Sequence, residues 1–349
     1  MKKQLNIQNL IRENIKNLQA YSSARDEFKD ASLDVVFMDA NENPYNSGLN
    51  RYPDPQQNLV KDELAKLKDV NKAQILLGNG SDEVLDLIFR AFCEPKVDNV
   101  IQLPPTYGMY KVLANTNDVE LVSVNLNDDF QPKVEKILET QNVKSKLLFL
   151  CSPNNPTANS FDADRIEKLI NNFNGIVVLD EAYIDFSEQE SWTSRFSEFP
   201  NLIVTQTLSK AYGLAGIRLG ICYASTEIIS VLNKIKPPYN VNKLTQEVAL
   251  KALQNQEKVD IEIKEIITER KLLIKELKSI SIIDKIFNSD ANFVLAKVDD
   301  ANKIYQELLQ KGIVVRNRSN QVLCENCLRF SIGTPLENKL LINTLKFLK

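Results

Sequence analysis

Continuous apolar runs, separated by longer amphipathic stretches, recur through the first two thirds of the chain. Runs without polar alternation are typical of parallel strands that are buried on both faces of a sheet. Between the first two runs, Val84, Ile88 and Phe92 recur at helical spacing. The pattern therefore predicts an α/β fold with a mostly parallel sheet covered by helices on both faces. The predicted strands are residues 75–77, 100–103, 120–124, 147–151, 176–179 and 202–205.

The pattern changes after about residue 240, where a long, charged, amphipathic helix is predicted at 258–279. Shorter elements follow it and indicate a compact α+β domain. They are strands at 292–298, 313–316 and 328–332, and helices at 337–348 and at 301–310, the latter ended by Gly312. We therefore expect a large domain over 41–240, a small domain over 241–349, and an N-terminal helix and arm over 1–40 that packs with the small domain.

The composition is that of a soluble globular protein, with 43% hydrophobic and 26% charged residues among 349. The net charge of −3 and the scattered basic residues give no indication of nucleic-acid binding. The chain begins without the apolar core of a signal peptide, and no stretch approaches the roughly 18 apolar residues of a membrane span. Five cysteines, an odd number, suit reduced thiols. We expect a cytoplasmic protein without membrane contact.

The absence of histidine restricts the chemistry more than any other count. It excludes Ser-His-Asp and Cys-His nucleophile systems and every histidine-ligated metal site, so we expect no metal. If the protein is an enzyme, its proton transfers must use Lys, Tyr, Asp, Glu or Cys, or a cofactor.

Three polar loops follow predicted strands, at 152–157, 180–183 and 207–213. Ligands of open α/β sheets bind at the carboxyl ends of the strands, so these loops predict a common site. Lys210 lies in the third loop, where partial burial lowers the pKa of an amine and lets it form Schiff bases with carbonyl compounds. Nearby hydroxyls and Arg218 suit a phosphate dianion. An ordinary loop lysine is the alternative interpretation of Lys210.

Other polar residues at this sheet edge also have two interpretations. Asp180 either pairs with a protonated ring nitrogen of a cofactor or makes a structural cap or ion pair. Asn155 and Tyr183 either contact the phenolic oxygen of such a cofactor or serve as a turn residue and a core residue. Ser81 and Asp82 open a helix, where backbone N–H groups bind phosphate, although Ser81 is equally a simple N-cap.

Two late arginines are candidates for anion recognition. Over 328–332, alternation puts Leu328 and Phe330 on one face of a strand and Arg329 on the other. A guanidinium on that face can bind a substrate carboxylate through two parallel hydrogen bonds. Arg316 ends the preceding predicted strand and is expected to face the same way. Surface arginines are the alternative.

The order of these features resembles that of the fold-type I pyridoxal-phosphate (PLP) aminotransferases. The shared order is an Asn-Pro loop, Asp-x-x-Tyr, Ser-Lys, an arginine eight residues after the lysine, and a late arginine. Several stretches are closer still to the histidinol-phosphate aminotransferases, and the resemblance runs from about residue 8 to the C-terminus. They are 20–25 (AYSSAR), 41–44 (NENP), 51–56 (RYPDPQ), 90–95 (RAFCEP), 104–110 (PPTYGMY), 151–157 and 207–218.

The resemblance implies a role for each matching residue. Lys210 is then the Schiff-base lysine and proton shuttle, Asp180 pairs with the pyridine nitrogen, and Tyr107 stacks on the ring. Asn155 and Tyr183 hold the phenolic oxygen. The implied contacts of the cofactor phosphate are Ser81, Asp82, Thr207, Ser209, Arg218 and, from the neighbouring subunit of a homodimer, Tyr52. The implied substrate contacts are Arg329 for an α-carboxylate, Arg316 for a substrate phosphate, and Tyr21, Asn43 and Asn292.

The resemblance also implies a reaction, the PLP-dependent transamination of L-histidinol phosphate with 2-oxoglutarate in histidine biosynthesis. The expected products are imidazole acetol phosphate and L-glutamate. An aromatic-amino-acid aminotransferase, a threonine-phosphate decarboxylase and a non-catalytic relative without cofactor are the alternatives. One departure is Ala158-Asn159 after Thr157, where the family usually has glycine and where a different turn is therefore expected.

Overall fold

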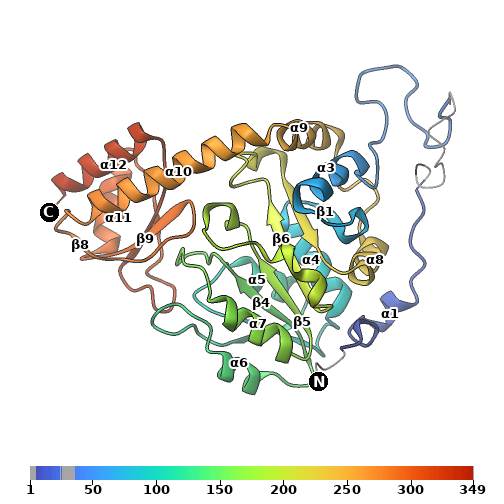
Figure 1. Cartoon of the computed structure of the whole chain (residues 1–349), viewed down its shortest axis with the longest axis horizontal. Helices are drawn as coiled ribbons and strands as arrows, with labels where there is room; N and C mark the ends of the chain where they lie inside the picture. The colour runs from blue at the N-terminus through green and yellow to red at the C-terminus, as the bar shows by residue number, and fades with distance from the viewer. Residues whose placement is uncertain (1–4, 24, 26–35, 349) are drawn as a thin grey trace.

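The computed structural model describes residues 5–23, 25 and 36–348 (Figure 1). The expected arm over 1–40 falls partly on residues 1–4, 24 and 26–35, which, like residue 349, lie outside the described residues. The described chain contains a seven-stranded sheet with helices and a smaller four-stranded sheet. This architecture confirms the predicted fold class.

The large sheet is mostly parallel, as predicted, with the strand order β1-β7-β6-β5-β4-β2-β3. β7 runs antiparallel to its neighbours β1 and β6, and the remaining pairs are parallel. Sequence reasoning missed β7, whose LGICY pattern contains a glycine. The strands are β1 (Ile75–Asn79), β2 (Asn99–Gln102), β3 (Glu120–Ser123), β4 (Ser145–Cys151), β5 (Ile176–Asp180), β6 (Leu202–Thr207) and β7 (Leu219–Tyr223).

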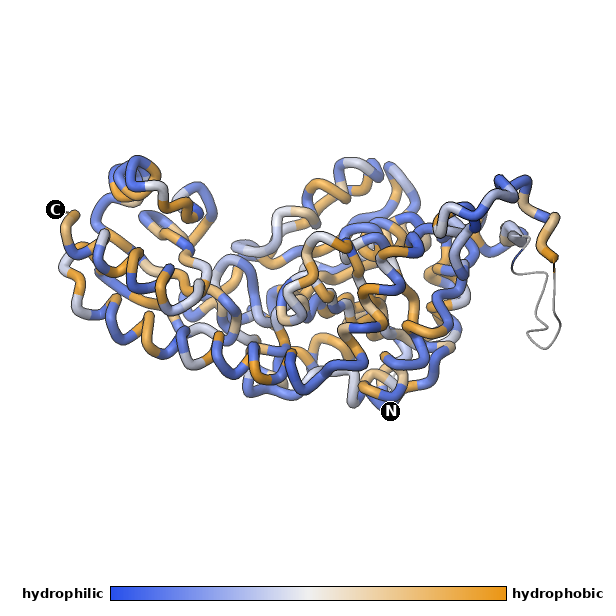
Figure 2. Tube along the Cα trace, turned by 90° about the horizontal axis from the view of Figure 1, so that it is seen from above, coloured by the Kyte–Doolittle hydropathy of each residue, from blue (hydrophilic) through white to orange (hydrophobic). Residues whose placement is uncertain are grey.

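The large sheet has a hydrophobic core on each face, because successive side chains of a strand point to opposite sides. In β5, Val177 and Leu179 pack in one core and Ile176 and Val178 in the other. The helices contribute apolar faces in the same way, as the alternating hydropathy along the chain in Figure 2 shows. On the first face lie α3 (Asn58–Lys68), α6 (Val134–Thr140), α7 (Ala163–Asn172) and α9 (Lys243–Leu253), and on the second α4 (Ser81–Phe92), α5 (Met109–Thr116) and α8 (Thr226–Ile235).

The small sheet is antiparallel throughout, in the order β10-β11-β9-β8. Its helices bury one face of this sheet in a separate core that includes Val294, Phe330 and Leu345. The longest of them, α10, runs from beside α9 to α12 at the opposite end of the molecule (Figure 1). The elements are β8 (Ile283–Ile286), β9 (Phe293–Val298), β10 (Arg316–Asn317), β11 (Cys327–Ser331), α10 (Gln256–Leu277), α11 (Ala301–Gln310) and α12 (Pro335–Phe347). None of the helices described is both long and apolar enough to cross a membrane.

The predicted strand at 313–316 is wrong over most of its length, because β10 begins only at Arg316. Gly312 takes a positive φ of 78° after α11. The Ile313 N–H then donates to the Leu308 carbonyl at 2.9 Å, which is the long hydrogen bond of a Schellman motif. The residues expected to extend the strand therefore end the helix instead, and Val314 is largely exposed.

The N-terminal segment packs on the large domain, so the expectation that it packs with the small domain is wrong for the described residues. Ile7, Ile11 and Ile15 join the core that contains α4 and α8, and Arg12 pairs with Glu94 at 3.0 Å. These apolar residues lie on η1 (Ile7–Asn9), on α1 (Glu13–Lys16) and between them. Their side chains pack against the apolar surface of the helices that cover the large sheet.

The residues just after 240 also belong with the large sheet, which corrects the predicted start of the small domain. Ala249 and Leu253 of α9 are buried in the core with β5 and β6. The change in the hydrophobic pattern after residue 240 therefore marks the end of the strands of the large sheet rather than the end of the large core.

Candidate active site

A cavity of about 260 Å³ lies at the carboxyl ends of β4, β5 and β6 and is closed on one side by β10 and β11. It brings together residues predicted from loops that are far apart in the sequence. The predicted site residues that line it are Ser81, Asp82, Tyr107, Asn155, Asp180, Tyr183, Thr207, Ser209, Lys210, Arg218, Arg316 and Arg329. The three polar loops thus meet at one sheet edge, as their positions after parallel strands require.

Asp180, the last residue of β5, presents a buried carboxylate to this cavity. Its oxygens accept hydrogen bonds from the Tyr110 hydroxyl at 2.8 Å and the Ala182 N–H at 3.2 Å. Burial raises the pKa of Asp180, although both hydrogen bonds act to lower it. The ion pairs formed within the described residues do not include this carboxylate, so a cationic group of a ligand would find it without a competing partner.

Lys210 follows β6 and is half-buried, with its Nζ atom 5.5 Å from the centre of the Tyr183 ring. Burial lowers the pKa of Lys210, and the nearby guanidinium of Arg329 lowers it further. Both effects favour the neutral amine, which is the form that attacks a carbonyl and accepts a proton.

This environment predicts how Lys210 reacts with pH. In the cofactor-free protein, the rate of PLP attachment to Lys210 should rise with pH and reach half its maximum below the ordinary lysine pKa, since only the neutral amine reacts. Arg329→Gln removes one neighbouring cation and should move this midpoint to higher pH. Stopped-flow absorbance at a series of pH values measures both midpoints. A wild-type midpoint at the ordinary lysine value would contradict the prediction.

Asn155 and Tyr183 link the large sheet to the small one. The Asn155 side-chain amide donates to the Tyr183 hydroxyl at 3.4 Å, and its oxygen accepts from Arg329 at 2.6 Å. Burial raises the pKa of Tyr183, so its hydroxyl stays protonated and can donate to a ligand oxygen. The two side chains can therefore form hydrogen bonds with a phenolic oxygen of a ligand that binds between Lys210 and Arg329.

The N-terminus of α4 forms one end of the cavity and has the features of a phosphate site. Gly80 precedes the helix with φ of 81°, and a Cβ there would lie 2.6 Å from a guanidinium nitrogen of Arg218. At the end of β6 and in the turn that follows it, the hydroxyls of Thr207 and Ser209 lie 3.0 Å apart. Free backbone N–H groups at a helix start, hydroxyls and an arginine together suit a dianion.

Tyr107 lies over the same end of the cavity, and its hydroxyl donates to Asp82 at 3.1 Å. Its ring meets Tyr110 edge-on at 5.7 Å, and Tyr110 stacks on Phe149 at 4.7 Å. These ring contacts hold the Tyr107 ring at the cavity that Asp180 also lines.

The sequence model of the family described as aminotransferase class I and II matches residues 18–345. The chain belongs to this family. A relative from Flavobacterium johnsoniae, named histidinol-phosphate aminotransferase, is 62% identical and covers 98% of this chain and 98% of its own length. A relative of the same name from Christiangramia forsetii is 59% identical and covers 99% of both chains.

Solved structures of other proteins share the fold of this aminotransferase. The histidinol-phosphate aminotransferase of Clostridium acetobutylicum superposes with a TM-score of 0.79 at 24% identity, over 86% of this chain and 90% of its own. That of Sinorhizobium meliloti, solved in complex with pyridoxal-5'-phosphate, gives 0.77 at 25% identity, over 85% and 82%. These similarities agree with the fold class expected from the sequence.

Four residues that the resemblance implied as contacts are not part of the lining of this cavity of the aminotransferase. Tyr21 and Tyr52 are exposed, and Tyr52 stacks on Tyr239 with ring centres 4.4 Å apart. The Asn43 side chain accepts from the Tyr45 N–H at 2.9 Å, and Asn292 accepts from Ile332 through its carbonyl. Within one chain, Tyr21, Asn43, Tyr52 and Asn292 are therefore not among the residues that line the cavity, although Phe293, next to Asn292, contacts Tyr183.

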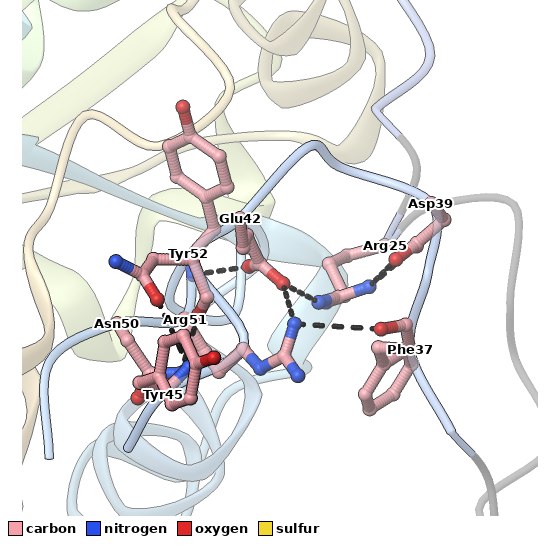
Figure 3. A network of polar contacts seen from close by, with 9 residues as sticks. Arg25, Phe37, Asp39, Glu42, Tyr45, Asn50, Arg51 and Tyr52 are labelled. Atoms are coloured by element: carbon pink, nitrogen blue, oxygen red, sulfur yellow. Dashed lines mark hydrogen bonds and ion pairs between the residues drawn. The ribbon is translucent and has the colours of Figure 1, made fainter. Parts of the chain in front are cut away.

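The loop that carries Tyr52 is held by a buried carboxylate (Figure 3). The Glu42 side chain is 3% exposed and accepts from the Tyr52 N–H at 2.6 Å, from Arg51 at 2.7 Å and from Arg25 at 2.8 Å. Burial acts to raise the pKa of Glu42, but these three donors outweigh it and the pKa is lowered. Arg25 also pairs with Asp39. Tyr52 is thus half exposed on a loop that Glu42 anchors through its backbone.

Sequence reasoning missed two residues that shape the active site of this aminotransferase. Tyr110 supplies a hydrogen bond to Asp180, and Arg318 lines the cavity beside Arg316 and Arg329. The signal for Arg318 was its spacing of two residues from Arg316, which places both on one face of an extended strand. No signal in the sequence indicated Tyr110, because its contact depends on how α5 packs on the sheet.

The turn after Thr157 keeps the backbone conformation that glycine favours. Ala158 has φ of 70° and is fully buried, and its N–H donates to the Asn154 carbonyl at 2.7 Å. Asn159 accepts from the Thr157 hydroxyl at 2.6 Å. The alanine therefore takes a left-handed conformation that costs L-residues energy, and the surrounding hydrogen bonds hold it.

Proposed function

We propose that this protein is a PLP-dependent aminotransferase that converts L-histidinol phosphate and 2-oxoglutarate into imidazole acetol phosphate and L-glutamate, a step of histidine biosynthesis. The observation that carries the proposal is a buried carboxylate, Asp180, that has no ion-pair partner among the described residues and shares a cavity with a half-buried lysine, Lys210. Names of relatives at 59–62% identity over nearly the whole chain support the substrate.

The residues of the cavity fit PLP. Asp180 would meet the ring nitrogen, and the α4 N-terminus with Arg218 would take the phosphate. When bound, PLP supplies an electron sink that stabilises negative charge at the substrate Cα atom. The residues proposed to hold it are Ser81, Asp82, Tyr107, Asn155, Asp180, Tyr183, Thr207, Ser209, Lys210, Arg218 and, from a neighbouring subunit, Tyr52.

The residues of this chain would divide the work as follows. Lys210 binds the cofactor and, as a free amine, moves the proton at the substrate Cα atom, which its lowered pKa favours. Asp180 keeps the ring nitrogen protonated, because an ionised carboxylate buried against a cation is stabilised by it. Asn155 and Tyr183 orient the phenolic oxygen, and the small sheet behind them helps to exclude water from the reacting atoms.

Substrate binding is assigned to the arginines from the small sheet. Arg329 would hold an α-carboxylate and Arg316 the phosphate of the amino donor. Tyr21, Asn43 and Asn292 are further proposed contacts, and since none of them lines the cavity of its own chain, Tyr21 and Asn43 would act on the cavity of a second copy.

We also propose a cytoplasmic homodimer with shared active sites. The support is the stretch 36–52, which projects from the end of the large domain opposite the small one (Figures 1 and 2). Val36, Met38, Tyr45 and Tyr52 on this segment are half or more exposed, an unusual gathering of large apolar residues for a free surface. The five cysteines are buried free thiols, which suits a reducing compartment.

A panel of amino donors tests the function. Purified protein loaded with PLP is assayed with 2-oxoglutarate and L-histidinol phosphate, phenylalanine, tyrosine or threonine phosphate. The largest kcat/KM is expected for L-histidinol phosphate. A much larger value for an aromatic amino acid would replace the substrate and keep the class, and carbon dioxide release from threonine phosphate would indicate the decarboxylase. Protein that never binds PLP would overturn the enzyme assignment.

Arg329→Ala should weaken the binding of glutamate and 2-oxoglutarate by about 2–5 kcal/mol, the usual cost of leaving one member of a buried charged pair alone. This corresponds to a rise in KM of roughly 30-fold to several thousand-fold. Steady-state kinetics with each substrate measures it, and Arg165→Gln on the outside of α7 is a control that should change nothing. An unchanged KM in Arg329→Ala would remove this residue from the site.

A further inference from the structure

Three arginines project from one face of the small sheet toward the cavity. In the register of β10 and β11, Arg316 lies directly opposite Arg329, and the Arg318 N–H donates to the Cys327 carbonyl at 2.8 Å. Residues two apart on a strand share a face, so Arg316, Arg318 and Arg329 share one. All three line the cavity that contains Lys210.

These guanidinium groups lack the partners that such a cluster needs. Within the described part of the chain, no carboxylate forms an ion pair with any of the three. Arg329 donates to Asn155, but the buried Nε atoms of Arg318 and Arg329 have no hydrogen-bond partner among the described residues. Like charges on facing strands destabilise a sheet, and buried donors without acceptors cost further free energy. The arrangement therefore has the character of a binding surface for anions.

Burial lowers the pKa of Arg318 and lowers that of Arg329 to about 10, and in each case neighbouring arginines add to the effect. The backbone of Arg318 is fixed on both sides, because its carbonyl also accepts from the Gln321 N–H at 2.9 Å. The backbone that carries this half-buried side chain is therefore already in place before any ligand binds.

The amount of positive charge indicates the class of ligand. A carboxylate is satisfied by one guanidinium in a bidentate pair, which Arg329 can provide. The second carboxylate of glutamate or 2-oxoglutarate would need only one of the two further guanidiniums, whereas a phosphate dianion, with two negative charges and three acceptor oxygens, can use both. Arg316 alone is exposed and would hold such a group weakly.

We propose that Arg318 is a substrate-specificity residue that, together with Arg316, binds the dianionic phosphate of the amino donor. This inference rests on the proposed function, since it takes the donor to carry a phosphate. In this arrangement Arg318 contacts the substrate directly. Arg316 and Arg318 bind the phosphate, and Arg329 binds the carboxylate of the second substrate.

The test compares PLP-loaded wild type with Arg318→Gln, using L-histidinol phosphate and L-histidinol as amino donors. We expect kcat/KM for the phosphorylated donor to fall at least about tenfold, the range for a lost hydrogen bond to a charged group. The value for L-histidinol should change by less than about twofold, since that donor has no group for Arg318 to contact. Inhibition of the enzyme by inorganic phosphate should weaken in parallel. Arg165→Gln serves as the remote control.

Two results would overturn the inference. An equal loss with both donors would show that Arg318 supports the fold of the site rather than the phosphate, and no loss with either would show that it makes no contact. If wild type does not prefer L-histidinol phosphate over L-histidinol, the proposed function fails instead. In that case, inhibition by inorganic phosphate, measured against whichever donor is used, still tests the role of Arg318. Unchanged inhibition in Arg318→Gln would exclude Arg318 from a phosphate site.

Discussion

Lys210→Ala should reduce the rate of amino transfer by roughly 10²–10⁴-fold, the usual contribution of a positioned acid or base, with a value near the upper end. The upper end is expected because Lys210 is proposed both to bind the cofactor and to move the proton. Among the described residues that line the cavity, no other lysine is available to replace it. The other basic side chains of the cavity are arginines, and the guanidinium group does not serve as a base in proteins.

Single-turnover kinetics with PLP-loaded protein measures this effect without interference from product release. Lys210→Arg is the matched variant, since it keeps the positive charge but has no neutral amine, and it should lose as much rate as Lys210→Ala. Lys61→Ala is the control for removal of a buried lysine, because Lys61 lies outside the cavity. A Lys210→Ala protein with more than about a tenth of the wild-type rate would exclude Lys210 from the proton transfer.

Asp180→Asn should lower kcat by about 10²–10³-fold, as is typical when one preorganised electrostatic contact of a buried site is lost. The amide is the same size and can still accept the hydrogen bond from Tyr110, so the fold should persist. It carries no negative charge, however, and cannot keep a ring nitrogen protonated. The absorption spectrum of the bound cofactor should therefore change together with the rate.

The adjacent residue provides a control for this variant. Glu181 is as buried as Asp180, but its oxygens accept from Trp192 at 2.8 Å and Gln206 at 2.9 Å, and it does not line the cavity. Glu181→Gln should lower the free energy of unfolding, since it weakens this network, and leave the cofactor spectrum unchanged. Equal spectral changes in Glu181→Gln and Asp180→Asn would contradict the assigned role of Asp180.

The elements that the sequence predicted well are those in which one physical requirement dominates. Residues 147–151 and 176–179 are apolar without interruption because both faces of β4 and β5 are buried, and the structure confirms both strands. At 313–316 two requirements competed, since β-branched residues favour a strand while Gly312 favours a helix end. The helix end prevailed there, and that outcome depended on where α11 stops against the small sheet.

The residues of the active site also divide into those that the sequence predicted and those that depend on packing. Asp180, Lys210 and Asn155 were predictable because each lies at or just after the end of a buried parallel strand, and the strand ends of one sheet meet at one edge. The packing of the N-terminal helices on α4 and the burial of α9 in the large core were not predictable. The pattern of an amphipathic helix indicates that one of its faces is buried, but it does not indicate which surface covers that face.

The sequence by itself excluded histidine chemistry and placed a lysine among polar residues that follow three strands, and the resemblance to the aminotransferases implied the cofactor. Tertiary packing alone decided what surrounds those residues. It placed the Tyr110 hydroxyl on Asp180, turned Arg318 toward the cavity beside Arg316, and kept Tyr52 outside it. Such contacts join residues distant in sequence, and the free energy of each depends on burial and on neighbouring charges that only the folded chain establishes.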